Sequence, residues 1–274
     1  MAVSTFIPTI WSARLLMHLD KALVAKSFFN TDYEGEISDM GDTVRINQIG
    51  AINIFDYVRN TDMTTPQETA TAAQDLIIDQ GKAFNFQIDD VDRVQMRGDL
   101  MDAAMERSAY ALAETEDTFL FNLLDAAVPA ANKAPASIAS PEEVYEVLVK
   151  LRTIMVKNNV PYAGRVAALP PDAVAMLLKD ERFVGTGGTE AESRLVAGLV
   201  GRAAGFDIFE VNTTPGDKTI IAGHPLASTF ASQIVKTEAY RMEKRFADGV
   251  KGLSVYGAKV LVPKALASSV LTFV

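Results

Sequence analysis

The feature that most constrains this fold is a pair of alternating segments joined by a polar tip. Residues 42–48 and 74–88 place apolar side chains at every second position, as strands with one buried face do. The tip between them, roughly residues 60–73, is rich in Thr, Ala, Gln and Asp and has few large apolar side chains. The pattern predicts a long antiparallel hairpin. Because such a hairpin cannot bury its own tip, it needs a neighbour to lie on.

Two helices are predicted after the hairpin. From 90 to 124 the chain is rich in Ala, Leu, Met and Glu and lacks Pro, so one helix about 45 Å long is expected. A second helix begins at Ser140, because Ser140 at the N-cap, Pro141 in the first turn and Glu143 form a capping box. Its apolar residues recur at helical steps and predict one buried face, formed by Val144, Val147, Leu148, Leu151 and Met155.

Beyond the second helix, short strands and helices alternate, which predicts a compact α+β unit. The expected elements are strands 165–169, 207–211 and 218–222, a helix opening at Pro171 and a helix over 190–197. Spaced glycines from 198 to 205 indicate a tight turn. Two long strands, 233–242 and 252–262, are expected to meet at an Asp248-Gly249 turn, to pair with the base of the hairpin and to cover the long helix.

The N-terminal segment predicts an amphipathic helix. Between residues 9 and 29 the apolar side chains fall mostly at three- and four-residue steps. Such a helix can lie on a neighbouring molecule or pack on its own core, and the sequence favours neither alternative.

Composition excludes several classes of protein. The 274 residues include no cysteine, which excludes disulfides and thiolate metal sites. No apolar run is long enough to span a membrane and no secretory signal is apparent, so the protein is expected to stay in the cytoplasm where it is made. The net charge of -9 is opposite in sign to that of nucleic-acid-binding surfaces. Solubility explains this charge, and a container that must not adhere to DNA is a second explanation.

No catalytic, cofactor-binding or metal-ligating residue is predicted. His18 and His224 are far apart and lack metal-ligand spacing, and no nucleophile elbow is present. The glycine-rich segment 185–189 lacks the Lys-Ser/Thr of a phosphate loop and is interpreted as a surface loop. The acidic cluster at 89–92 precedes the long helix, where the helix dipole favours negative charge, although such oxygen ligands also suit Mg²⁺ or Ca²⁺.

Six segments, taken in their order along the chain, carry a resemblance to a known family. They are residues 6–12, 32–36, 41–46, 88–92, 246–252 and 255–260. In their order and in the elements between them, they resemble the HK97-like major capsid proteins of tailed bacteriophages, in particular the compact coat proteins related to that of phage P22. The resemblance covers nearly the whole chain.

This resemblance implies an α+β, HK97-like capsid fold made of five regions. They are an N-terminal arm (1–30), an extended E-loop hairpin and its base (31–89), a peripheral domain with a long spine helix (90–136), an axial domain (137–232), and C-terminal strands that complete the peripheral domain (233–274). The implied function is structural: a coat protein, not an enzyme, that self-assembles into the icosahedral virion shell around the genome.

The resemblance also implies partners. The expected assembly is a shell of hexamers and pentamers built with a separate scaffolding protein, because no long charged helical extension precedes the arm. A portal and a decoration protein are further partners, packaged double-stranded DNA is contacted weakly and non-specifically, and no membrane is involved. Cross-linked relatives present an E-loop lysine to a neighbour's asparagine. Residues 47–81 contain no lysine, so no covalent cross-link is expected.

Candidate contacts between subunits follow from the same reasoning. They are Trp11, Leu15 and Leu16 in the arm, and Phe55, Tyr57 and Arg59 in the hairpin. The alternative is that the aromatic residues fill their own subunit's core. Two other functions stay open: an encapsulin-like shell around an enzyme cargo, and a soluble α+β enzyme that uses the 185–189 loop with Asp180, Glu181 or Arg194.

Overall fold

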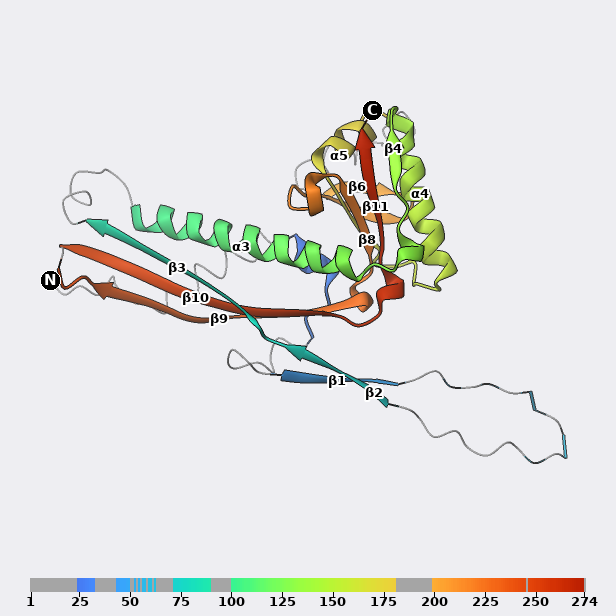
Figure 1. Ribbon diagram of the computed structural model, residues 1–274, viewed down its shortest axis with the longest axis horizontal. Coiled ribbons are helices and arrows are strands. Elements are labelled where there is room, and N and C mark those ends of the chain that lie inside the picture. The colour runs from blue at the N-terminus through green and yellow to red at the C-terminus, as the bar shows by residue number, and fades with distance from the viewer. Residues whose placement is uncertain are drawn as a thin grey trace.

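The computed structural model describes residues 24–32, 43–49, 71–89, 100–180, 199–244 and 246–273, with single positions between 52 and 62. Figure 1 shows a compact unit at one end, from which the long helix α3 (Leu100–Ala127) and a long ribbon of strands run in one direction. A separate hairpin extends to the other side. The subunit is therefore elongated, with much of its backbone outside the compact unit.

The compact unit is built on a six-stranded sheet. In spatial order its strands are β4 (Ala136–Ile138), β11 (Ala267–Phe273), β8 (Thr219–Gly223), β5 (Val166–Leu169), β7 (Phe206–Glu210) and β6 (Leu199–Ala203). Two pairs, β4 with β11 and β5 with β7, are parallel, and the others are antiparallel. Every residue of the central strands β5 and β8 is buried, so both faces of the sheet are covered there.

Helix α4 (Pro141–Lys157) packs on this unit as the sequence predicts. The carboxylate of Glu143 accepts the backbone N–H of Ser140 at 3.1 Å, which completes the capping box. The five apolar residues expected on the buried face are all buried. A shorter helix, α5 (Pro171–Leu177), begins after Pro170. Local capping and periodicity were sufficient here because the helix buries a single stripe.

A three-stranded sheet forms the ribbon beneath α3. Strand β10 (Ala247–Val260) lies between β3 (Gln80–Asp89) and β9 (Ser228–Arg241), and both pairings are antiparallel. Side chains of β3 alternate, and Phe84 and Phe86 pack with Met105 and Ala109 of α3. A Cβ atom on Gly252 of β10 would overlap the Phe84 ring, so this glycine permits the close packing.

The separate hairpin consists of β1 (Thr43–Ile49) and β2 (Thr71–Ile77), paired from Thr43 with Ile77 to Ile49 with Thr71. Its base is anchored by a small apolar cluster of Val44, Ile46, Leu76, Ile78, Ala231 and Val255. The predicted long hairpin is therefore confirmed, and the described apolar packing lies at its base.

Residues 24–30 join the compact unit to α3. The 3-10 helix η1 (Ala25–Phe28) buries Phe28, whose ring lies 5.6 Å from that of Phe121 on α3 and 6.4 Å from that of Phe209 on β7. Asn30 then forms a parallel bridge with Thr229 at the start of β9. This short segment contacts a helix, the six-stranded sheet and the three-stranded sheet.

Three expectations about strands and turns are corrected. The predicted strand 74–88 is two strands with different partners, because β2 pairs with β1 whereas β3 pairs with β10. The Asp248-Gly249 pair lies inside β10, and the chain reverses between Met242 and Ala247. Gly249 is needed because a Cβ there would overlap the Tyr240 ring on β9. Residues 199–203 are a strand that leads into the turn at 204–205.

The domain bounds that the resemblance implies place residues 267–273 with the peripheral strands. They form β11, which pairs with β4 and β8 in the six-stranded sheet. The expected helices over 9–29 and 190–197 lie outside the described residues, apart from residues 24–29. Of the long helix predicted over 90–124, the described part begins at Leu100 and continues to Ala127, before Pro129.

Candidate assembly surfaces

The hairpin beyond β1 exposes large apolar side chains. Ile52 is 72% exposed, Ile54 is 96% exposed and Tyr57 is 75% exposed. Arg59, two residues further, is exposed as well. Figure 1 shows strands β1 and β2, which carry this hairpin, extending away from the compact unit and from α3. A group of exposed apolar residues on an extended limb is typical of a surface that another molecule covers.

Of the predicted contact residues, the structure brings Tyr57 and Arg59 together on this exposed limb. Trp11, Leu15, Leu16 and Phe55 lie outside the described residues. The alternative that the hairpin's aromatic residues fill the core of their own subunit is not correct for Tyr57, because its ring is largely exposed.

A buried carboxylate on α3 holds the start of η1. Asp117 on α3 is 5% exposed and accepts the backbone N–H groups of Val24 at 3.3 Å and Ala25 at 3.1 Å. These N–H groups belong to the first turn of η1, where they have no helical partner of their own. Burial raises the pKa of Asp117 to about 6, because its effect exceeds that of the two N–H donors, which lower the pKa.

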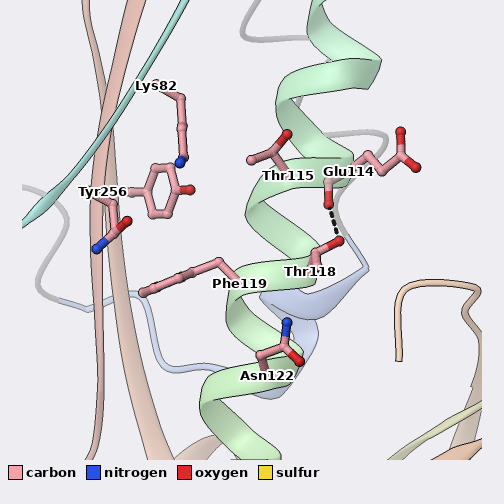
Figure 2. Close-up of a pocket in the computed structure, with 8 residues that line it drawn as sticks. Lys82, Glu114, Thr115, Thr118, Phe119, Asn122 and Tyr256 are labelled. Carbon is pink, nitrogen blue, oxygen red and sulfur yellow. Dashed lines mark hydrogen bonds between the residues drawn. The ribbon is translucent and has the colours of Figure 1, made fainter. Parts of the chain in front are cut away.

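A polar cleft of about 400 Å³ separates α3 from the β3 end of the three-stranded sheet. Figure 2 shows Lys82 and Tyr256 reaching toward α3 from the sheet side, Phe119 pointing back from the helix, and Glu114 pointing away from the sheet. The Tyr256 ring is fully buried, and its centroid lies 5.5 Å from that of Phe119. Burial, followed by the charges of Glu116 and Asp79, raises the pKa of Tyr256 to about 12.

Sequence reasoning missed Asp117 and Tyr256. Both lie inside regular elements and face the interior, so no motif or turn signal marks them. The one available signal was helical spacing: Asp117 lies three or four positions from the apolar Leu120 and Phe121, on a helix face where an acidic residue is buried only with specific partners. Glu116 is also buried, and its carboxylate accepts the Ser254 hydroxyl at 3.0 Å.

Within the described part of the chain, no three His, Asp or Glu side chains form a group that could hold a metal ion. The helices that the structure describes include none long and apolar enough to cross a bilayer. Asp180 is buried, whereas the 185–189 loop, Glu181 and Arg194 lie outside the described residues.

A family model for phage capsid proteins matches residues 72–269. The chain belongs to this family. The capsid protein is a structural component of the virion, and as a major capsid protein it forms the shell of a phage head. Membership of this family decides against the two alternative functions, an encapsulin-like shell around an enzyme cargo and a soluble enzyme, because neither is a phage capsid protein.

Solved structures agree with this assignment. A structure from Mycobacterium phage Che8 is 29% identical to the capsid protein, covers 90% of each chain and has a TM-score of 0.73. The capsid of Cyanophage P-SCSP1u is 17% identical, covers 87% of this chain and 85% of its own, and has a TM-score of 0.68. The mature capsid of bacteriophage PhiM1 is 15% identical with 89% and 88% coverage and a TM-score of 0.65.

These matches confirm the predicted α+β, HK97-like capsid fold; the two with lower identity support the fold alone. No curated protein matches the sequence of the capsid protein.

Proposed function

We propose that the capsid protein builds an icosahedral shell of hexamers and pentamers in which the hairpin and the N-terminal arm clasp adjacent copies. The observation that carries the proposal is the exposure of Ile52, Ile54 and Tyr57 on a limb that extends away from its own subunit. Leaving these side chains in water sacrifices roughly 1.5–3 kcal/mol of burial energy each, which a neighbouring copy would recover. Extended limbs of this kind let thin subunits bury large interfaces.

The subdivision of the chain follows the sheets. We assign residues 1–30 to the arm, 31–89 to the E-loop hairpin with its base, 90–136 to the peripheral domain with α3 as spine, and 137–232 to the axial domain. Residues 233–241 of β9 and strand β10 belong with the peripheral domain, because β9 and β10 pair under α3. The pairing of β11 with β4 and β8 supports moving residues 267–273 from the peripheral to the axial domain.

We infer that the shell is not covalently cross-linked, because residues 47–81 offer no lysine. Mature particles boiled in detergent should therefore run on a denaturing gel as single chains of 29.6 kDa. A ladder of covalent multimers would contradict this inference without affecting the assembly proposal.

The proposed partners are a separate scaffolding protein, a portal and a decoration protein. Packaged DNA is expected to be contacted weakly and non-specifically, since the chain carries a net charge of -9. The short length of the chain and the order of its elements support its placement among the P22-coat-related proteins. Expression of the chain alone, compared with co-expression of its scaffolding protein, tests the first partner: alone it should give aberrant or open assemblies.

The clasp is tested with variants of the limb. Tyr57→Ala should abolish or sharply reduce closed shells in negative-stain micrographs, while Tyr57→Phe, the matched control, should assemble nearly as well as wild type. Trp11→Ala, with Leu15 and Leu16 as further positions, should weaken assembly more than folding. If wild-type protein stays a monomer on size-exclusion chromatography even with scaffold present, the proposed function is wrong.

A further inference from the structure

The outer face of the three-stranded sheet contains an apolar hollow of about 500 Å³. Its lining comes from β3, β9 and β10 and consists of Ala83, Phe84, Asn85, Glu238, Lys251, Gly252 and Leu253. Ala83 and Asn85 alternate with Phe84 and Phe86 along β3, so they point away from α3. The hollow therefore lies on the face of the sheet opposite the spine helix.

We propose that this hollow receives Tyr57 from the hairpin of a neighbouring copy. The inference rests on the proposed function, because it names the surface that the clasping hairpin grips. Its first support is the direction of the limb: Figure 1 shows the β1–β2 hairpin and the three-stranded sheet extending to opposite sides of the subunit. A hairpin that points away from its own hollow can reach only that of another copy.

The second support is the match between apolar groups. Leu253 is 37% exposed at the floor of the hollow, beside the exposed Ala83 that pairs with it. The register of β10 with β9 shifts between Leu253 and Ser254, a β-bulge of the kind that often redirects side chains at binding surfaces. An aromatic ring is the side chain that most often anchors such an interface.

The third support is complementary charge. Asp56 and Arg59 flank Tyr57 on the limb, and among the residues described neither has an ion pair. Lys251 and Glu238 form an ion pair of 2.8 Å at the rim of the hollow, and both remain partly exposed. With Tyr57 seated, Asp56 lies beside Lys251 and Arg59 beside Glu238, so that the single ion pair at the rim becomes a network of four alternating charges.

The tyrosine hydroxyl also finds a partner. The side-chain oxygen of Asn85 already accepts the Tyr240 hydroxyl at 2.9 Å, which fixes the orientation of the amide. The amide N–H groups of Asn85 then remain available to donate to the Tyr57 hydroxyl at the rim of the hollow. The hydroxyl stays at the edge, so its burial incurs little desolvation cost.

The absence of cysteine from the chain permits a direct test by disulfide trapping. Trapping needs contact between copies but not closed shells, so the variant carrying Tyr57→Cys and Leu253→Cys is concentrated together with its scaffolding protein, oxidised mildly and run on a non-reducing gel. Each copy carries one cysteine on the limb and one in the hollow, so each can link to two neighbours. The expected result is a ladder of disulfide-linked multimers that collapses on reduction. The matched control pair, Tyr57→Cys with Val149→Cys on α4, should give no ladder.

Charge exchange provides a second test that needs no disulfide geometry. Asp56→Lys should lower the yield of closed shells about tenfold, and adding Lys251→Glu should restore it to within about twofold of wild type. Asp62→Lys, which makes the same charge change further along the tip, should not respond to Lys251→Glu. Shells that form normally without a ladder and without rescue would overturn the inference while leaving the proposed function intact. Failure of wild-type protein to form shells would instead refute the proposed function.

Discussion

The carboxylate of Asp117 accepts the backbone N–H of Ala25 at 3.1 Å, although the two residues are 92 positions apart in sequence. Asp117 belongs to α3, and Ala25 begins η1, so this hydrogen bond fastens η1 to the long helix. The bond to Val24 strengthens the same attachment. The start of η1 is thus fixed to α3 by one buried acid.

The stability of the unassembled subunit should depend on pH through this acid. The folded-state pKa of Asp117 is about 6, above the value of about 3.9 expected in an unfolded chain, so the folded protein holds the proton more tightly. The raised pKa therefore contributes to the free energy of unfolding through protonated Asp117. This contribution is fully present below about pH 4 and is lost as pH rises through 6, a total change of roughly 2–3 kcal/mol.

Urea unfolding of wild type and Asp117→Asn at pH 4 and pH 7 measures this contribution. The difference in unfolding free energy between the two proteins should shift in favour of the asparagine variant on going from pH 4 to pH 7. Equal shifts for both proteins would show that Asp117 does not titrate in this range.

Removing the buried ring of Phe28 should destabilise the subunit far more than removing the exposed ring of Phe246. Phe28→Ala removes a fully buried ring that contacts Phe121 and Phe209, so the free energy of unfolding should fall by about 3–5 kcal/mol. Phe246→Ala, in which the lost ring is 79% exposed, should change it by less than about 0.5 kcal/mol. Thermal unfolding followed by circular dichroism compares the two, and similar losses would contradict the described packing.

Tyr256 should tolerate loss of its hydroxyl. Within the described structure this buried hydroxyl has no hydrogen-bond partner, so Tyr256→Phe should leave the free energy of unfolding unchanged or raise it by up to about 1 kcal/mol. Tyr240→Phe is the matched control, because it removes a hydroxyl that donates to Asn85 and should lose roughly 0.5–1 kcal/mol. Denaturant midpoints compare the stabilities of the two variants. A clear loss of stability for Tyr256→Phe would show that its hydroxyl has a hydrogen-bond partner.

Gly252 should not accept a methyl group while Phe84 is present. Gly252→Ala is expected to lose about 1–3 kcal/mol, because the new Cβ overlaps the Phe84 ring on the adjacent strand. In the Phe84→Ala background the same substitution should cost much less. A double-mutant cycle measures this coupling by denaturant unfolding, and additive effects would show that the overlap is relieved elsewhere.

The sequence predicted local features well and changes of partner poorly. Helix α4 was found from Ser140 to its end because capping and apolar spacing are encoded within the helix itself. The division between β2 and β3 left no local mark, since apolar alternation continues through Ile78 while the partner strand changes. Gly249 resembled a turn residue, yet its purpose is to accommodate a ring that approaches from β9.

The candidate surfaces show the same division. Tyr57 and Arg59 were predicted as contacts because a hairpin whose tip has few large apolar residues cannot bury that tip by itself and needs a neighbouring molecule. The hollow at Leu253 and the acid at Asp117 could not be predicted, because each depends on strands or helices that are far apart along the chain.

The position of β11 has a consequence for the order of events during synthesis. This strand occupies an interior place between β4 and β8, yet its residues are synthesised after those of every other strand in the six-stranded sheet. A nascent chain can form α3, α4 and most strands earlier, but the six-stranded sheet lacks an interior strand until residues 267–273 have been synthesised. Chains that lack residues 267–273 are therefore expected to leave the six-stranded sheet incomplete and to be excluded from a growing shell.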